Sequence, residues 1–323
     1  MLNKSSIANY ILAFLFIVSL NFILPRLMPG DPLQAIYGDE ALVSMTPELK
    51  AELIRRFSLD QSIGEQFVSY VLALGRGDLG HSYYYNAPVL QIILGYLPWT
   101  ILLVGLTILI STTIGFILGI ESGYKRGRAL DKTLLSGLMF VNGFPDFFVG
   151  ILMLLLFGAV LGLVPLAGAI TPYAEQNSLA FVLDILHHLC LPLCTLVLVR
   201  ISSTYLLTRN TMISNLGEAY ILTARAKGCQ AQAIKYRHAG RNSLLPVVTN
   251  TGLQLAHLIT GTLFIELVFS YPGIGSLMYT SLLTRDYPLL QGILLVVTVI
   301  VLLTNCLLDV IYKKLDPRVN YAH

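Results

Sequence analysis

The sequence has little charge. Asp, Glu, Lys and Arg together make up 12% of its 323 residues, whereas 55% of the residues are apolar. Soluble globular domains carry about 25% charged residues, so the share here is about half the usual one. This composition excludes an ordinary water-soluble domain, because a folded surface in water needs more polar side chains than this chain can supply.

Cysteine is also scarce. The four cysteines, Cys190, Cys194, Cys229 and Cys306, are scattered along the chain without paired spacing. Small secreted domains that depend on disulfides have a regular series of cysteines, so that class is excluded. By default we interpret all four as small apolar side chains.

Two kinds of enzymatic motif are missing. The sequence contains no Gly-x4-Gly-Lys-Ser/Thr phosphate loop. Because that loop is the usual cradle for nucleotide phosphates, we expect ATP not to be bound by this chain. A membrane-bound enzyme would need a convergent nucleophile, base or metal site, and no such set occurs with motif-grade spacing. We therefore expect a protein that is not an enzyme.

What the sequence does have is long apolar stretches. The six lie at 7–27, 97–120, 147–163, 189–207, 246–269 and 289–311. Most reach the roughly 20 residues with which a helix crosses a hydrocarbon core of about 30 Å, and they are apolar nearly all round. No small-residue cleavage site follows the first, so we interpret it as an uncleaved span. The expected fold class is an all-α membrane protein with six transmembrane helices.

The basic residues indicate the orientation of these spans. When the loops are assigned alternately to the two sides, 15 of the 21 Lys and Arg residues fall on one side. The opposite loop at 164–188 has none, and the loop at 270–288 has only Arg285. By the positive-inside rule, we expect a multi-pass protein of the cytoplasmic (inner) membrane with both termini in the cytoplasm.

The spans also define the expected organisation of the chain. The predicted segments are the N-terminus with the first span at 1–28, an extracytoplasmic helical segment at 29–95, a core with spans two to six at 96–314, and a cytoplasmic tail at 315–323. In the extracytoplasmic segment, Thr46 before Pro47 predicts a helix to about residue 57, and a second helix is predicted over 63–74. This segment is either a cap over the outer mouth of a pore or a passive structured loop.

Two acidic residues in the apolar stretches are candidates for a pathway or gate. Asp146 follows Gly143, Phe144 and Pro145, a sequence that predicts a kink or break because proline interrupts helical hydrogen bonding. Glu266 lies where the fifth span is expected to leave the membrane. Ionisable groups in spans usually face a bundle interior or water. The alternative is a structural role, such as helix capping by Glu266.

The loop at 208–245 is far longer than a connection between two spans requires, and it is rich in helix-forming and basic residues. Small side chains in it would let a partner backbone approach, a glycine would end its helix, and its cations would suit an acidic groove. The predicted docking residues are Glu218, Thr223, Ala224, Arg225, Ala226, Lys227 and Gly228, together with Arg237 and Arg241, and His238 and Asn242, which form pairs four residues apart on one helical face.

The sequence of this loop resembles that of a known family. It contains Thr-Ala-Arg-Ala-Lys-Gly at 223–228 and Arg-His-Ala-x-Arg-Asn-x-Leu-Leu-Pro at 237–246. Both are similar to the coupling loop, or EAA loop, of permease subunits of binding-protein-dependent ABC importers, in the branch for dipeptides, oligopeptides and nickel. Further motifs in the family's order lie at 26–32, 76–80, 271–275, 285–288 and 315–318, so the resemblance covers nearly the whole chain.

The resemblance implies the type I ABC importer permease fold and a set of partners. These partners are a homologous permease subunit, two ABC ATPase subunits that bind ATP and magnesium, an extracytoplasmic solute-binding protein and membrane lipid. It implies no nucleic acid and no cofactor in this chain. The solute implied is a short peptide or a nickel or other metal chelate, which would cross by alternating access while the partner subunits hydrolyse ATP.

Two positions depart from the family's pattern. Gly240 stands where a larger apolar residue is usual, which lowers helix propensity by about 1 kcal/mol. Asp146 occupies a place more often held by a small polar residue, and this change bears on the pathway.

Other interpretations remain open. An ion-gradient-driven secondary transporter or channel would also have six spans and intramembrane acids, although it would not need a helical docking loop. His187, Cys190 and Cys194 suggest a metal site, since they would lie near one another on a helix and their donor atoms suit nickel, copper or zinc. Routine packing at the start of a span is the structural alternative for these three residues.

Overall fold

The computed structural model describes residues 4–27, 37–38, 42, 45–56, 61–173 and 179–315. Within these ranges the chain is helical, and the only β-type pairing is an isolated bridge between His81 and Pro88. The predicted all-α class is therefore confirmed for the described residues. The predicted tail after Leu315 and most of the motif at 26–32 lie outside them.

Among the residues that the structure describes, three helices are long and apolar enough to cross a membrane. They are α5 (Val89–Tyr124), α8 (Leu179–Leu216) and the first 22 residues of α13 (Tyr287–Leu315). A fourth candidate joins α6 (Ala129–Asn142) to α7 (Asp146–Met153) and its continuation, the π-helix η1 (Leu154–Val160), across a bend of 99°. The bend falls at 143–145, where the sequence predicts a break. The described helices thus support a multi-pass membrane protein with three or four candidate spans.

The remaining predicted stretches are helical but do not add candidate spans among the described residues. α1 (Lys4–Arg26) covers the first stretch, and its apolar part, Phe14–Leu24, is shorter than a span. α10 (Arg241–Gly261) and α11 (Leu263–Val268) cover the fifth, interrupted at Thr262. α10 also carries polar residues such as Asn250 and Gln254. The prediction of six spans is therefore not confirmed by these helices.

Contacts divide the chain into two compact units, the first of which combines residues 1–98 with 273–303. Besides parts of the long helices it contains α3 (Pro47–Arg56), α4 (Ile63–Gly75) and α12 (Ile274–Leu283). The two helices predicted for the extracytoplasmic segment are confirmed by α3 and α4. Ser62 and Glu65 form a capping box at the start of α4, which satisfies two of its first backbone N–H groups.

Asp286 anchors two separate segments of this unit. Its carboxylate is fully buried and accepts hydrogen bonds from Ser82 Oγ at 2.5 Å and from the backbone N–H of Tyr84 at 3.0 Å. It also accepts the backbone N–H of Leu289 at 3.2 Å, which caps the first turn of α13. The motif at 285–288 is therefore used to fasten the chain after Gly80. One buried apolar cluster of this unit consists of Val89, Ile93, Ile274, Leu277, Leu289 and Ile293.

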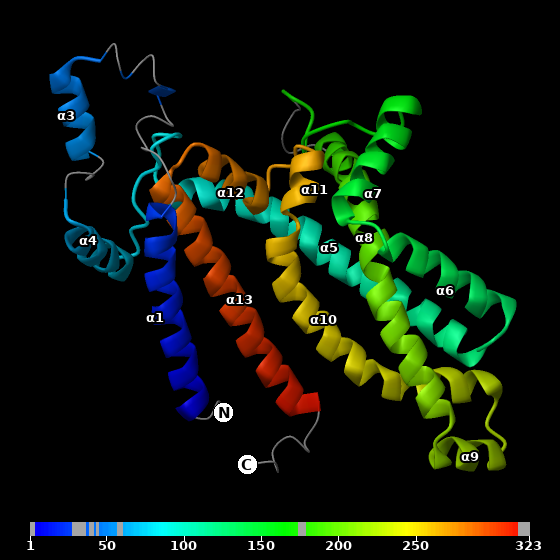
Figure 1. The fold of residues 1–323 in the computed structure, drawn as a ribbon. Coiled ribbons are helices and arrows are strands. Elements are labelled where there is room, and N and C mark those ends of the chain that lie inside the picture. The colour runs from blue at the N-terminus through cyan, green and yellow to red at the C-terminus, as the bar shows by residue number, and fades with distance from the viewer. Residues whose placement is uncertain are drawn as a thin grey trace. The chain divides into compact units, whose positions relative to one another are not determined.

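The second unit combines residues 99–272 with 304–323. In it α5 and α8 approach closely, since a Cβ atom on Gly119 would lie only 2.5 Å from Thr208 Cβ. Three glycines four residues apart, Gly115, Gly119 and Gly123, let the two helix backbones meet in this way. α8 is followed by the short helix α9 (Ala219–Ala226) and the π-helix η2 (Ala233–Gly240), which lead into α10. Figure 1 shows α9 beyond the C-terminal end of α8, at the opposite end of this unit from α7 and α11.

Candidate coupling site

The helix α9 is the centre of the predicted docking loop. It makes only two turns and ends in a reversal of the chain, in which Gly228 has φ +72°. The N–H of Cys229 donates to Ala224 O at 3.1 Å and that of Gly228 donates to Arg225 O at 3.0 Å. This pair of hydrogen bonds is a Schellman motif, which favours glycine because its backbone is left-handed. The helix end predicted at Gly228 is thus confirmed.

One face of α9 packs against its own chain. Ile221 is buried in a cluster with Ile120 of α5, Met212 of α8 and Ala239 of η2. Ala224, almost one turn further along the helix, is also buried. The small Ala224 side chain, which was predicted to admit a partner backbone, is therefore not part of the exposed surface of α9. Its role in docking stays a prediction.

The opposite face of α9 is exposed and includes apolar side chains. Leu222 is 62% exposed and Tyr220 is 37% exposed. The other exposed positions are Glu218, Ala219, Thr223, Arg225, Ala226, Lys227 and Gly228, which include six of the predicted docking residues. Leu222 and Tyr220 were not among the predicted docking residues. Ile221 and Leu222 are adjacent in a helix, so they cannot both face inward, and this was the available signal.

The segment after α9 is wider than the predicted α-helix. Residues 233–240 form the π-helix η2, in which Arg237 is exposed and His238 is half-buried, and Arg241 and Asn242 are exposed in the first turn of α10. Gly240 is buried, and a Cβ atom there would lie 2.8 Å from Lys235 O and 3.0 Å from Ile120 Cδ1. Glycine at this position therefore permits a close contact with α5. This packing contact could not be predicted from helix propensity, which considers only the loss of stability that glycine causes within a helix.

Polar contacts tie this segment to α5 and α8. Lys235 Nζ and Tyr236 Oη both donate to Glu121 Oε1 near the end of α5, at 2.5 and 2.6 Å. Asn215, in the last turn of α8, donates to Ala239 O at 3.2 Å and to Ser243 Oγ at 3.0 Å. These contacts fasten η2 to the same helix ends against which α9 packs.

The charges in the Glu121 contact are stable near neutral pH. Burial disfavours the Lys235 charge, but the hydrogen bond to Glu121 and the negative charge of that residue outweigh burial, so the pKa of Lys235 lies above its ordinary value. The hydrogen bond to Glu121, together with burial, raises the pKa of Tyr236. Both groups therefore keep the protons that they donate.

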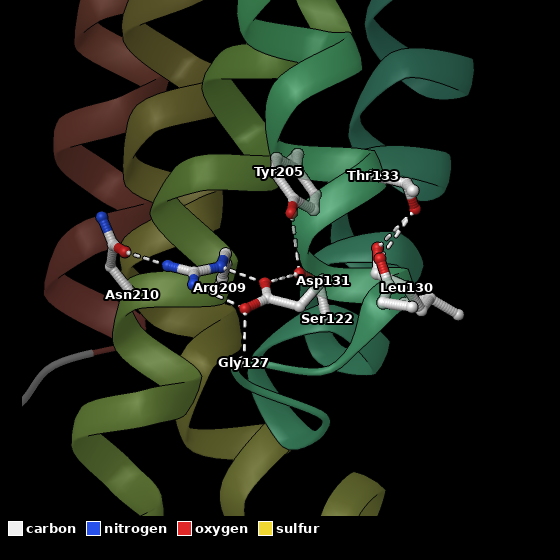
Figure 2. A network of polar contacts seen from close by, with 9 residues as sticks. Ser122, Gly127, Leu130, Asp131, Thr133, Tyr205, Arg209 and Asn210 are labelled. Carbon is white, nitrogen blue, oxygen red and sulfur yellow. Dashed lines mark hydrogen bonds and ion pairs between the residues drawn. The ribbon is translucent and has the colours of Figure 1, made fainter.

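A buried ion pair joins α6 to α8 at the same end of the unit (Figure 2). Asp131 accepts hydrogen bonds from Arg209 Nε at 2.6 Å and Nη2 at 2.9 Å. It also accepts Ser122 Oγ at 2.5 Å and the backbone N–H of Gly127 at 2.8 Å, while Ser122 contacts Tyr205 Oη at 2.7 Å. The network closes the turn between α5 and α6. A force on α9 would therefore reach α5, α6 and α8 through contacts that are already formed.

About two thirds of the chain matches one protein family. Residues 111–321, which include the whole loop, match the family described as the binding-protein-dependent transport system inner membrane component. The chain belongs to this family. It is a permease component of a transport system in the inner membrane.

Individual relatives of this permease match it along nearly their full lengths. It is 32% identical over 322 residues to the di/tripeptide transport system permease protein DppB of Pseudomonas aeruginosa, covering 95% of each chain. It is 31% identical over 325 residues to the dipeptide transport system permease protein DppB of Escherichia coli K12, again covering 95% of each. A putative peptide transport system permease protein of Brucella suis is 34% identical over 315 residues, covering 98% of this chain and 97% of the relative.

The two acids predicted for the pathway or gate lie in different surroundings in the permease. Glu266 in α11 is fully buried and accepts hydrogen bonds from Thr100 Oγ1 at 2.9 Å and Thr262 Oγ1 at 3.1 Å. These contacts connect α11 to α5. Asp146, at the start of α7, is paired with Arg200 of α8 at 2.6 Å, and both side chains are partly exposed. The structure thus encloses Glu266 and leaves Asp146 accessible.

The three residues that the sequence left open as a metal site, His187, Cys190 and Cys194, were interpreted by default as ordinary packing residues. Among the described residues, no group of three or more His, Cys, Asp and Glu side chains is placed to hold a metal ion. The ring of His187 lies with Nε2 3.0 Å from Leu163 O, while Cys190 and Cys194 are exposed on α8. The imidazole is therefore directed to a backbone carbonyl.

Proposed function

We infer that this permease forms part of the membrane path of an ATP-driven importer for short peptides. The names of its relatives support the peptide assignment, since each printed name includes peptide, dipeptide or di/tripeptide transport. The sequence alone left a nickel or other metal chelate equally open, and none of these names supports that choice. The solute would cross by alternating access, driven by ATP hydrolysis on two partner ATPase subunits.

The six crossings of this proposal correspond to helices of the fold. We assign them to α1, α5, the bent pair α6 and α7 with η1, α8, α10 with α11, and α13. This assignment places α9 and both termini in the cytoplasm, in agreement with the distribution of basic residues. A homologous second permease subunit and an extracytoplasmic solute-binding protein complete the proposed assembly in the membrane lipid.

The observation that carries the proposal is the two-faced construction of α9. Its inner face is packed against α5 and α8 through Ile221, and its outer face presents exposed Leu222, Arg225 and Ala226. An exposed apolar side chain between cations suits a groove of a partner protein that combines apolar and acidic groups. A helix that is free outside and fixed inside can transmit the movement of a partner to the spans.

The full importer, with its ATPase subunits and solute-binding protein, can be reconstituted in liposomes to test this function. We expect Leu222→Arg and Ala226→Trp each to reduce ATP-dependent dipeptide uptake at least about tenfold, because interface residues in the centre of a contact often contribute about 2 kcal/mol or more. Leu222→Met is the matched control and should retain uptake. Unchanged uptake in both disruptive variants would show that α9 is not the coupling element.

The alternative of an ion-gradient-driven transporter is tested in the same liposomes. We expect no uptake when ATP is replaced by a non-hydrolysable analogue, even with a proton gradient across the membrane. Uptake that continues without hydrolysis and stops when the gradient is collapsed would support the secondary transporter instead.

A further inference from the structure

The ion pair between Asp146 and Arg200 lies beside a hollow in the second unit. The hollow has a volume of about 250 Å³ and is lined by Asn142, Phe144, Asp146, Val199, Arg200, Ser203 and Gln254. Pockets that enclose drug-sized ligands usually measure roughly 300–1,000 Å³, so this one fits a small solute or one end of a longer solute.

In the proposed topology, the pair lies at the membrane level. Arg200 lies within three residues of the midpoint of the 38-residue helix α8, and Asp146 begins α7 directly after the 99° bend. Charged groups at that depth face water or protein because contact with lipid is very unfavourable. With 32% of the Arg200 side chain and 26% of the Asp146 side chain exposed, the hollow is suited to hold water or a polar solute.

The Asp146–Arg200 ion pair is held by fewer hydrogen bonds than the Asp131–Arg209 ion pair, so it can exchange its partners for a solute more easily. Asp131 is 3% exposed as a side chain and accepts four hydrogen bonds, two of them from one guanidinium. Asp146 accepts one hydrogen bond among the described residues, from Arg200 Nη2. Most of the acceptor positions of this carboxylate and most of the donors of the guanidinium therefore remain available.

Further polar groups surround the pair. Gln254 Nε2 donates to Ser203 Oγ at 3.1 Å, while Gln254 Oε1 and Arg200 Nε are buried and have no hydrogen-bond partner among the described residues. Buried donors and acceptors of this kind are normally satisfied, so the site is prepared for a polar occupant.

We propose that Asp146 and Arg200 form a subsite for the two charged groups of a zwitterionic solute, in which Asp146 binds the ammonium group and Arg200 binds the carboxylate. The exchange turns one ion pair and one zwitterion into two ion pairs, so no net charge enters the membrane level of the protein. A guanidinium is well shaped for a carboxylate, which it binds with two parallel hydrogen bonds. A free metal cation would find Asp146 accompanied by the positive Arg200, which opposes its entry.

This subsite deepens the proposed function and rests on it, because it assigns a solute class to the path of the importer. The test uses the full importer in liposomes with three labelled probes: alanyl-alanine, its N-acetyl derivative and its C-terminal amide. The same solute-binding protein is present in every sample. Differences between permease variants therefore report on the permease, and the readout is the uptake of each derivative relative to alanyl-alanine.

The two charge-removing variants should change these ratios in different ways. We expect Asp146→Asn to raise the relative uptake of the N-acetyl derivative about tenfold, since its carboxylate no longer selects for an ammonium group. Arg200→Gln should do the same for the amide and leave the N-acetyl ratio unchanged. Asp184→Asn is the control, because it removes an acid of α8 that is bonded to Thr171 and does not line the hollow. Both uptake ratios should stay as in the wild type.

The outcomes distinguish the subsite from the proposed function. Assembly of each variant with its partners is checked by size-exclusion chromatography, and if only one variant assembles, its own ratio decides. An equal decrease for all three probes, or unchanged ratios in assembled variants, overturns the subsite while ATP-dependent uptake by the wild type still supports the importer. Absence of ATP-dependent peptide uptake by the wild type would instead overturn the function itself.

Discussion

The guanidinium of Arg209 forms two hydrogen bonds to the carboxylate of Asp131, at 2.6 and 2.9 Å, and fixes α8 to the start of α6. Ser122 and Gly127 satisfy the remaining acceptor positions of the carboxylate, so the whole turn between α5 and α6 is organised around one acidic side chain (Figure 2). The helix ends that contact α9 and η2 belong to the same unit. This pair therefore holds together the part of the permease that α9 would move.

Removing the carboxylate at this site should destabilise the permease strongly. In Asp131→Ala the Arg209 charge stays largely buried without its partner, a change that typically costs about 3–5 kcal/mol. We expect thermal unfolding of the detergent-solubilised protein at a clearly lower temperature. Thr133→Ala is the control, since Thr133 lies nearby in α6 but is exposed and bonds only to backbone carbonyls of its own helix. Similar unfolding temperatures for both variants would contradict a stabilising role for the ion pair.

The close contact between α5 and α8 predicts a sharp difference between two glycines of the same helix. A Cβ atom on Gly119 would lie 2.5 Å from Thr208 Cβ and 2.9 Å from Tyr205 O, whereas one on Gly105 would have no neighbour within 4 Å among the described residues. Gly119→Ala should therefore destabilise the protein by about 1–3 kcal/mol. Gly105→Ala should be neutral or stabilise it by up to about 1 kcal/mol through helix propensity.

Thermal unfolding of the two glycine variants under identical detergent conditions is the measurement. The prediction requires the Gly119→Ala protein to unfold first. If Gly105→Ala proves to be the more damaging substitution, the packing of α5 on α8 is not as described.

Local features of the sequence were sufficient for much of the fold. The start of α3 follows from Thr46 and Pro47, the break before Asp146 follows from Pro145, and the end of α9 follows from Gly228. In each case the physical cause lies within a few residues of its effect. Such causes can be recognised in the sequence without knowledge of the tertiary contacts.

Contacts between distant residues could not be predicted in this way. Asp131 and Arg209 are 78 positions apart, and Thr100 and Glu266 are 166 positions apart. The direction in which Ala224 points depends on where α5 and α8 end, and the sequence pattern alone does not define these positions. The partner of Asp146 was missed for the same reason, since Arg200 is 54 positions away from it.

The buried Asp286 predicts a local opening in the first unit when it is replaced. In Asp286→Ala the Ser82 hydroxyl and the N–H groups of Tyr84 and Leu289 lose their acceptor, and each buried group left unsatisfied costs about 1–3 kcal/mol. We expect the segment 81–87 to become sensitive to chymotrypsin, with new cleavage after Tyr84 or Tyr85.

The comparison for this variant is Thr284→Ala, because the Thr284 hydroxyl bonds only to carbonyls of its own helix. Mass spectrometry of the limited digest identifies the cleavage sites. A digest of Asp286→Ala that matches the wild type and Thr284→Ala would mean that the segment is held by other contacts.

The left-handed turn at Gly228 links the stability of α9 to coupling. Alanine at φ +72° introduces strain of about 1–2 kcal/mol, which should loosen the Schellman hydrogen bonds to Ala224 and Arg225 without changing the exposed face of the helix. If α9 transmits motion from the ATPase subunits, a loosened helix end should let ATP be hydrolysed without import of a dipeptide. We therefore expect Gly228→Ala to lower the number of dipeptides imported per ATP hydrolysed more than it lowers hydrolysis itself.

Gly228→Asn should have a milder effect, since asparagine tolerates this backbone conformation better. Gly217→Ala is the control, because Gly217 precedes α9 without a positive φ and a Cβ atom there would make only an ordinary contact, 3.4 Å from Ser214 O. A proportional fall of transport and hydrolysis in Gly228→Ala would indicate that the turn serves assembly of the complex and has no separate part in coupling.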